Sequence, residues 1–241
     1  MARQADLATL DGPMLAPAEG ATPKRLVILL HGVGADGQDL IGLAPYFQIV
    51  LPDALFVAPN APQAFDMAPP SMGLGGHQWF SLQDMSPPAR LAGCQKAAPI
   101  LDRFIDEKLA ETGLSESATA LIGFSQGTMM ALYVGLRRAR QLAGIVGYSG
   151  VLVGKELLAD AIRSRPPVLL VHGEDDPLVP VAALDEAAAG LQAVGVAVKA
   201  VRRPGLPHGI DDEGIRLGME FLAQVFGVDL EAIKRRRQAG G

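Results

Sequence analysis

Gly123-Phe124-Ser125-Gln126-Gly127, in the middle of the 241-residue chain, is the stretch that decides the fold. It has the pattern G-x-S-x-G. An apolar run at residues 118–122 precedes it and predicts a short buried strand, and residues 128–138 after it predict a helix. A strand, a sharp turn and a helix are the context in which this pattern forms a nucleophile elbow. The two glycines fit such a turn, because side chains there would strike the neighbouring strand or helix. We therefore expect the Ser125 hydroxyl above the edge of a sheet, with backbone N–H groups of the helix start facing it.

Predicted strands and helices alternate along the rest of the chain. The strands are expected at residues 25–30, 55–58, 118–122, 142–148, 167–171 and 196–202, and the helices at residues 36–47, 90–112, 128–138, 155–163, 181–194, 210–226 and 230–237. This alternation fits parallel βα units. We predict one α/β domain over residues 1–241, with a doubly wound, mostly parallel sheet that binds its ligand at the carboxyl ends of the strands.

Two segments do not follow the alternating pattern. Residues 1–23 are rich in Ala, Pro and Gly and predict an irregular arm, or an edge hairpin around Leu7–Leu15. Residues 61–88 contain five prolines and three glycines, together with several large apolar side chains. A long loop in a compact domain is usually functional or disordered, and the apolar side chains argue against disorder. We expect this segment to pack over the substrate site.

Composition excludes several classes of protein. The chain has 49% hydrophobic residues and a net charge of −5, which argues against a nucleic-acid binder, and its one basic cluster, Lys234–Arg237, fits the last turn of a helix. The single cysteine, Cys94, forms no intramolecular disulfide and is interpreted as a packing residue. The first residues lack the apolar stretch of a secretory signal, so none is expected, and no apolar run approaches the ~18 residues of a membrane span. We predict a cytoplasmic protein without integral membrane association.

Candidate catalytic partners of Ser125 follow two of the predicted strands. Three acids, Glu174, Asp175 and Asp176, come after the strand at residues 167–171, and His208 comes after the strand at residues 196–202. The order Ser, acid, His is the chain order expected on an α/β-hydrolase sheet. Asp176 is favoured because Pro177 holds its backbone away from the helical region, and Asp175 is the main alternative.

These residue types suit nucleophilic catalysis. A serine hydroxyl needs an adjacent base, and His208 is the only histidine after the acid, so it would take the Ser125 proton. His31 and His172 end strands as His-Gly pairs and are expected to bond the backbone, whereas His77 lies in the long loop.

The tetrahedral oxyanion needs fixed hydrogen-bond donors. We expect them to be the backbone N–H of Gln126 and that of Val33, which belongs to the glycine-rich loop at residues 31–34.

The chain resembles the carboxylesterase/phospholipase group of α/β-hydrolases, which includes the acyl-protein thioesterases. The matching segments are residues 29–37, 123–127, 172–180 and 205–208, with residues 78–80 similar to a Trp-containing loop of that group. The resemblance runs from about residue 25 to residue 225. It implies Ser125 as nucleophile, Asp176 as acid, His208 as base and Val33 and Gln126 as oxyanion donors, with no metal or organic cofactor. It also favours Asp176 over Asp175.

Two positions depart from the pattern of the group. Thr128 follows the elbow where glycine or alanine is frequent, and Ser81 follows Trp79-Phe80 where an acid is common. Both departures leave the shape of the pocket and the acyl preference open.

The predicted function is that of a serine carboxylesterase that hydrolyses short to medium chain carboxylic esters through an acyl-enzyme intermediate. The acyl group of this small-molecule ester would lie against Leu74, Trp79, Phe80, Leu178 and Val179. Two alternatives are an acyl-protein or acyl-CoA thioesterase, which would use the same residues, and a non-catalytic binding protein on a hydrolase fold. The last is disfavoured because all three catalytic residues are present. A homodimer through the apolar loop is a further hypothesis.

Overall fold

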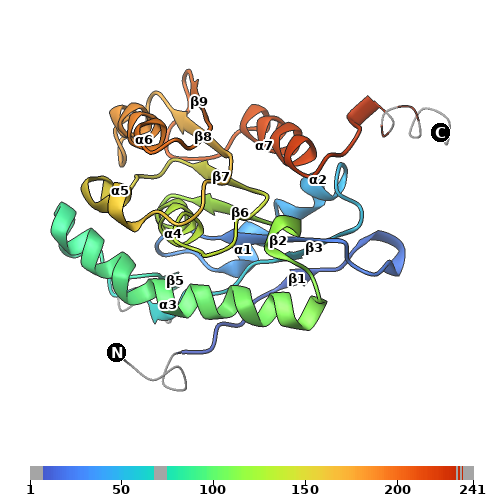
Figure 1. Ribbon diagram of the computed structural model, residues 1–241. Helices are drawn as coiled ribbons and strands as arrows, with labels where there is room; N and C mark the ends of the chain where they lie inside the picture. Colours follow the sequence, from blue (N-terminus) through green and yellow to red (C-terminus); the bar gives the residue numbers. More distant parts are fainter. Residues whose placement is uncertain (1–7, 68–74, 232, 234, 236–241) are drawn as a thin grey trace.

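A seven-stranded sheet forms the centre of the computed structural model, which describes residues 8–67, 75–231, 233 and 235 (Figure 1). The strands lie in the order β1-β3-β2-β6-β7-β8-β9, and only the edge strand β1 is antiparallel to its neighbour. Their bounds are β1 Met14–Leu15, β2 Arg25–Leu30, β3 Ala54–Val57, β6 Thr119–Phe124, β7 Gly144–Tyr148, β8 Val168–Gly173 and β9 Val198–Arg203. The predicted doubly wound, mostly parallel sheet is confirmed.

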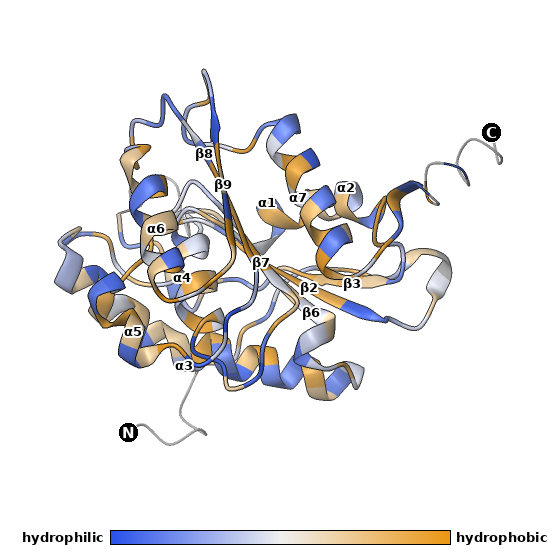
Figure 2. Cartoon of the chain, turned by 45° about the horizontal axis from the view of Figure 1, so that its top comes forward, coloured by the Kyte–Doolittle hydropathy of each residue, from blue (hydrophilic) through white to orange (hydrophobic). Residues whose placement is uncertain are grey.

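Helices cover both faces of the sheet. One face carries α3 (Pro87–Thr112), α4 (Gln126–Gly135), α5 (Leu158–Ala161) and α6 (Ala182–Ala193), and the other carries α1 (Gly37–Ile41), α2 (Ala44–Gln48) and α7 (Asp212–Val225). Successive strand residues point to opposite faces. In β2, Leu26, Ile28 and Leu30 therefore join the first core, while Val27 and Leu29 join the second. Figure 2 shows the strands as mainly hydrophobic ribbons between more hydrophilic helices.

The helix that follows Ser125 lies deep in the protein. All ten residues of α4 are buried, between the sheet and α3. Such a helix has no polar face, which explains why residues 129–136 form a continuous apolar run. The serine that precedes α4 is therefore anchored to the most enclosed element of the fold.

Two predicted helices are shorter than expected. The helix expected at residues 36–47 divides into α1 and α2, with Pro45 in the first turn of α2. Proline fits a first turn but cannot continue a helix, because it has no N–H to donate. The helix expected at residues 155–163 forms a 3-10 turn, η5 (Lys155–Leu157), and the single turn α5.

The irregular segments are more ordered than the sequence predicted. β1 is the edge element expected within residues 1–23, although residues 1–7 lie outside the described part and the remainder holds no hairpin, only the 3-10 turn η2 (Ala18–Gly20) after β1. The segment at residues 61–88 is not wholly irregular, because β4 (Gln63–Ala64) and β5 (His77–Gln78) pair as an antiparallel ribbon. The 3-10 turn η4 (Glu116–Ala118) leads into β6. The helix expected at residues 230–237 lies partly outside the described residues.

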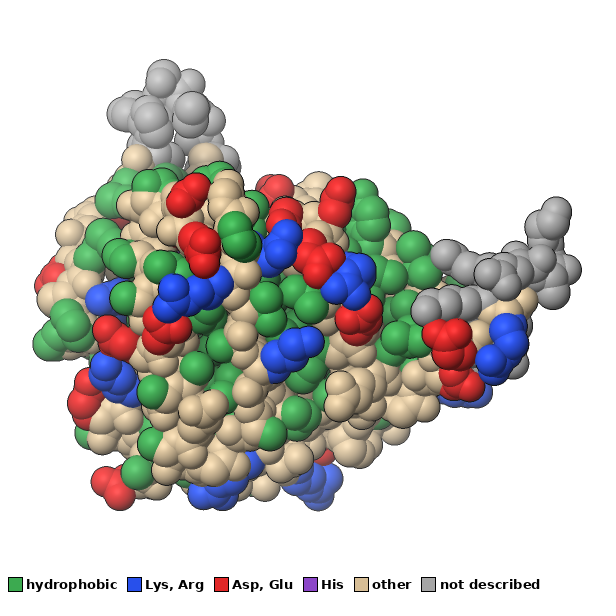
Figure 3. Space-filling model, turned by 90° about the horizontal axis from the view of Figure 1, so that it is seen from above, with side chains coloured by type: hydrophobic (Ala, Val, Ile, Leu, Met, Phe, Trp, Pro, Cys, Tyr) green, Lys and Arg blue, Asp and Glu red, His purple; other side chains and the backbone are tan. Residues whose placement is uncertain are grey.

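The outer surface mixes the two signs of charge. On the face shown in Figure 3, basic and acidic side chains alternate and form no broad patch of one sign. Ion pairs such as those of Arg216 with Glu213 and Glu220 on α7 belong to this pattern. Within the described chain, no helix combines the length and the hydrophobicity that a membrane crossing requires.

Candidate active site

The turn between β6 and α4 presents Ser125 at the carboxyl edge of the sheet. Ser125 has φ 52° and ψ −114°, a conformation that residues other than glycine rarely adopt. Both flanking glycines are required sterically. A Cβ at Gly127 would lie 1.8 Å from the carbonyl oxygen of Leu30, and one at Gly123 would lie 2.5 Å from the backbone of Gly127. The sharp elbow predicted from the sequence is the turn observed.

Asp176 and His208 meet next to this turn. His208 Nδ1 lies 2.7 Å from Asp176 Oδ2, while Asp176 Oδ1 accepts hydrogen bonds from the N–H groups of Leu178 (2.9 Å) and Val179 (2.8 Å). Burial favours a raised pKa for Asp176, but the bonds from Val179, His208 and Leu178 outweigh it and the pKa is lowered. The carboxylate is therefore charged at neutral pH and directed at the imidazole.

The two neighbouring acids lie away from the imidazole. Glu174 and Asp175 are exposed, and their N–H groups bond the carbonyl oxygens of Arg203 and Leu206. Of the three acids considered from the sequence, the structure brings only Asp176 to His208.

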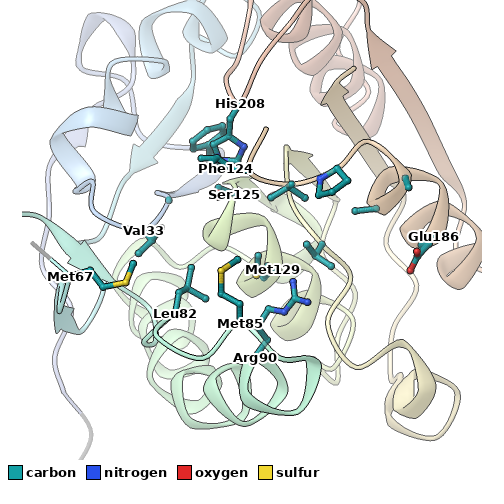
Figure 4. A pocket seen from close by; sticks show the side chains of 17 residues that line it. Val33, Met67, Leu82, Met85, Arg90, Phe124, Ser125, Met129, Glu186 and His208 are labelled. Atoms are coloured by element: carbon teal, nitrogen blue, oxygen red, sulfur yellow. The ribbon is translucent and has the colours of Figure 1, made fainter. Parts of the chain in front are cut away.

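His208 and Ser125 border the same cavity (Figure 4). The ring of Phe124 packs on the imidazole with centroids 4.9 Å apart. Because Nδ1 of His208 is bonded to the carboxylate, Nε2 is the nitrogen left to exchange a proton with a serine hydroxyl. The structure thus brings Asp176 to His208 and places His208 and Ser125 at the same cavity.

Two other histidines hold the loops that carry this site. His172 Nε2 donates to the carbonyl oxygen of Val179 at 2.8 Å and lies 3.3 Å from Asp176 Oδ2. His31 Nδ1 donates to the carbonyl oxygen of Gly32 at 2.7 Å, and its Nε2 accepts from the N–H of Ala61 at 2.9 Å. Burial is the largest effect on the pKa of His31 and lowers it. Both histidines bond the backbone, as expected for strand-end His-Gly pairs.

The two expected oxyanion donors come from loops that meet at Ser125. Gln126 is the first residue of α4, so its N–H has no acceptor within the helix. Val33 lines the cavity, and a Cβ at the preceding Gly32 would lie only 3.3 Å from the Cβ of Ser125. The loop after β2 therefore passes directly against Ser125.

The side chain of Gln126 has a function that the sequence did not reveal. Its Oε1 accepts the N–H of Trp79 at 2.8 Å, and its Nε2 donates to the carbonyl oxygen of Phe80 at 2.7 Å. The Trp79 indole N–H in turn donates to the carbonyl oxygen of His31 at 3.0 Å. These bonds join the segment at residues 61–88 to the elbow and to the loop after β2. A lone amide that opens an apolar helix is the only sequence signal of this link.

The predicted acyl contacts are only partly reproduced. Leu178 and Val179 line the cavity, and Leu74 lies outside the described residues. Trp79 and Phe80 do not line it, because both are buried in the core on the α3 side of the sheet. An apolar side chain on a loop can pack inward as readily as toward a ligand, and these two pack inward.

The cavity beside Ser125 has a volume of about 520 Å³ and a mainly apolar lining. Met67, Leu82, Met85, Met129 and Val151 are among the lining residues that the sequence did not suggest. They lie in the long segment, in the buried helix α4 and after β7, and no local pattern marks them. Two charged residues, Arg90 and Glu186, also line the cavity.

The two departures from the family pattern lie outside the cavity lining. Thr128 is buried, and its Cβ and methyl group occupy the space that a Cβ at Gly147 or Gly150 would need. Ser81 is exposed. Neither residue therefore shapes the described pocket directly.

Cys94 is a packing residue, as predicted. It is fully buried in the core, and burial raises the pKa of its thiol to about 12. A thiol with that pKa is not a nucleophile at neutral pH.

Comparison with known proteins agrees with this geometry. A model of the phospholipase/carboxylesterase family matches residues 16–226. Esterase YpfH of Escherichia coli (strain K12) is 27% identical over 199 residues, which cover 83% of this chain and 82% of that protein. Acyl-protein thioesterase 1 of Schizosaccharomyces pombe is 29% identical over 227 residues, or 91% and 98% of the two chains. The crystal structure of esterase PE8 has a TM-score of 0.84 and 42% identity, and the match covers 90% of this chain and 100% of that one. The resemblance predicted from the sequence is confirmed, and the chain belongs to the phospholipase/carboxylesterase family.

Proposed function

We propose that the protein is a serine carboxylesterase that hydrolyses short to medium chain carboxylic esters through an acyl-enzyme. The observation that carries this proposal is the Asp176–His208 hydrogen bond of 2.7 Å at the cavity that Ser125 also lines. Family membership and relatives named as esterases support the same reaction.

The first half of the reaction acylates the enzyme. His208 Nε2 takes the proton of the Ser125 hydroxyl as the oxygen attacks the ester carbonyl, and Asp176 holds the imidazole in the required tautomer. The N–H groups of Val33 and Gln126 donate to the resulting oxyanion. His208 then gives its proton to the departing alkoxide, which leaves as an alcohol, and the acyl group stays on Ser125.

The second half releases the acid. A water molecule gives a proton to His208 and attacks the acyl carbonyl, and the oxyanion forms again at the same donors. The proton returns to Ser125 Oγ as the carboxylic acid departs. The reaction needs no other group than these residues and water.

The size of the cavity supports the proposed range of acyl chains. A cavity of about 520 Å³ with aliphatic walls such as Met129, Val151 and Leu178 accepts an apolar chain by removing it from water. Each CH₂ that enters contributes about 0.8 kcal/mol, until the chain fills the space. The rate should therefore rise with chain length and then fall.

Hydrolysis of p-nitrophenyl esters with acyl chains of two to twelve carbons tests the proposal. Ser125→Ala should lose about 10⁶-fold in turnover, as in comparable triads. Full activity in the Ser125→Ala variant would show that Ser125 is not the nucleophile.

The identity of the acid is tested separately. Asp176→Asn should lower turnover by about 10⁴-fold, because the amide selects the wrong imidazole tautomer. Asp175→Asn is the matched control and should stay near the native rate, since the Asp175 side chain is exposed. If Asp175→Asn lowers turnover more than Asp176→Asn, Asp175 is the acid that orients His208.

A thioesterase is the second candidate, favoured by the match to acyl-protein thioesterase 1 of Schizosaccharomyces pombe. The same triad cleaves a thioester, whose leaving group needs less protonation. Comparing kcat/KM for an ester and a thioester of the same acyl group decides between the two substrates.

A fluorophosphonate that labels native protein but not Ser125→Ala would rule out a non-catalytic binding protein. A cytoplasmic location and a homodimer remain predictions.

A further inference from the structure

Arg90 is a charged side chain in a cavity whose lining is otherwise mainly apolar. It lies in the first turn of α3, is half-buried, and borders the same cavity as Ser125 and His208. Figure 4 shows its guanidinium beside Met85 and Met129, on the side of the cavity away from His208. A substrate bound at Ser125 and extending through the cavity would reach this cation.

The guanidinium of Arg90 has no ion-pair partner among the described residues. The first turn of α3 contains no acid, and the other cavity charge, Glu186, is paired with Lys155 at 2.7 Å. The backbone N–H of Arg90 bonds the carbonyl oxygen of Ser86. Its side chain forms no hydrogen bond with any residue that the structure describes. The contrast is Arg138 in the same layer, which is paired with Asp102 and Asp106.

The position of Arg90 is unfavourable for a merely structural cation. The positive end of the helix dipole lies at the first turn, where cations are disfavoured. A half-buried cation also loses part of its hydration and regains it only through a partner. An anion bound at Arg90 would reduce both the unfavourable interaction with the helix dipole and the cost of the lost hydration.

We propose that Arg90 makes the enzyme selective for esters that carry a carboxylate at the end remote from the cleaved bond. The fork of N–H donors on a guanidinium matches a carboxylate in two parallel hydrogen bonds. The apolar walls would hold the aliphatic spacer between the carboxylate and the ester. This inference rests on the proposed function and adds a substrate class to it.

Other features of the cavity favour a carboxylate over a doubly charged phosphate. Glu186 lines the same cavity, and the part of its negative charge that Lys155 does not offset repels a dianion more strongly than a monoanion. A neighbouring depression of about 200 Å³ shares Arg90, Val151 and Glu186 with the catalytic cavity. It offers room for a small planar group next to the guanidinium.

Two substrate series test the proposal by pH-stat titration at a pH where the carboxylate is ionised. The first compares monomethyl esters of dicarboxylic acids of four to ten carbons with methyl esters of monocarboxylic acids of equal length. The second places the carboxylate on the alcohol side, in acetate esters of ω-hydroxy acids. We expect a higher kcat/KM for the charged ester at one or more lengths in one of the two series. The responding series identifies the side of the substrate that lies toward α3.

Three variants assign that preference to Arg90. Arg90→Met keeps most of the apolar stem and should lose about 10- to 100-fold in kcat/KM for the charged ester, mainly through KM, with little change for the neutral ester. Arg90→Lys keeps the charge but not the fork and should lose less. Lys96→Met, an exposed position on the same helix, should change neither. Added salt should reduce the preference of the native enzyme.

Several outcomes would overturn the proposal. The first is a native enzyme that shows no preference for either charged series. The second is an Arg90→Met variant that loses the same factor on charged and neutral esters, which would indicate a structural role; its urea unfolding midpoint would then also fall. If neither the charged nor the neutral esters are hydrolysed, the proposed function fails rather than the role of Arg90.

Discussion

The elbow at residues 123–127 and the segment at residues 61–88 both border the catalytic residues, but they are fixed in opposite ways. The elbow is determined by its own backbone, through two glycines that admit no side chain and a serine with positive φ. The described part of the segment contains one short ribbon and is held by hydrogen bonds that Trp79 donates to Gln126 and His31 and that Gln126 donates to Phe80. A site can therefore combine a serine whose position follows from its own backbone turn with a wall that is positioned mainly by hydrogen bonds to other parts of the chain.

The largest expected effect comes from breaking the elbow itself. In Gly127→Ala, the new Cβ would meet the carbonyl oxygen of Leu30 at 1.8 Å, and two backbones would have to separate. We expect a loss of unfolding free energy on the order of 4 kcal/mol, measured by urea denaturation. Gly209→Ala is the control, because a Cβ there meets nothing within 4 Å. Equal stability of the two variants would show that the elbow yields more easily than its geometry indicates.

The second largest effect is expected when the hydrogen bonds between Gln126 of the elbow and the segment at residues 61–88 are removed. Gln126→Met keeps the side-chain length but leaves the Trp79 N–H and the Phe80 carbonyl unpaired, at a cost of about 3 kcal/mol for the two groups together. We expect kcat/KM to fall by about 100-fold, because small displacements of the loops at the nucleophile misalign the reaction. Protease cleavage within residues 61–88 should also become faster.

Gln48, a half-buried glutamine far from the elbow in the sequence, provides the matched control for that variant. Gln48 donates one hydrogen bond to the carbonyl oxygen of Ala16 at the surface, so Gln48→Met should leave cleavage and activity near native values. If Gln126→Met behaves the same way, the segment is held by packing of Trp79 and Phe80 alone.

This contrast also separates what the sequence predicts from what it does not. The elbow and the alternation of strands and helices are local or periodic patterns, and the structure reproduces them. The triad stays a prediction, supported by the hydrogen bond between Asp176 and His208. Trp79 and Phe80 were expected in the pocket because they are apolar and lie in a loop, yet both pack into the core. Arg90 was not expected, because the direction of one side chain on a long helix depends on how the helix packs.

A smaller effect is expected where the elbow meets the next strand. The Thr128 hydroxyl lies 2.8 Å from the carbonyl oxygen of Gly123 and 2.9 Å from that of Tyr148. Thr128→Val keeps the shape but removes the donor, and should cost about 1 kcal/mol in urea denaturation. The dependence of kcat/KM on acyl length should not change, because Thr128 does not line the cavity. A shifted length optimum would mean that this residue shapes the pocket through its neighbours.

The smallest expected effect is a pH-dependent loss of stability that originates at His31, next to the loop after β2. It is absent at neutral pH. Burial is the main reason that the pKa of His31 lies below its ordinary value of 6.5, and the nearby His77 adds to the decrease. Above pH 6.5, His31 is neutral in both folded and unfolded chains and its full contribution to stability is present. As the pH falls below 6.5, the unfolded chain binds a proton that the folded chain resists, so stability decreases until the folded pKa is reached.

Urea denaturation of native protein and His31→Gln at a series of pH values measures the pH-dependent contribution of His31 to the free energy of unfolding. Protonation of His31 Nε2 would remove the acceptor for the Ala61 N–H, which forms one of the bonds that tie the segment at residues 61–88 to the loop after β2. A glutamine can accept that bond without titrating, so the variant should lose less stability between about pH 7 and pH 5. His77→Gln is the control for the neighbouring imidazole. Parallel pH curves for native protein and His31→Gln would show that His31 is not the titrating group, and the link at Ala61 would then be independent of pH in this range.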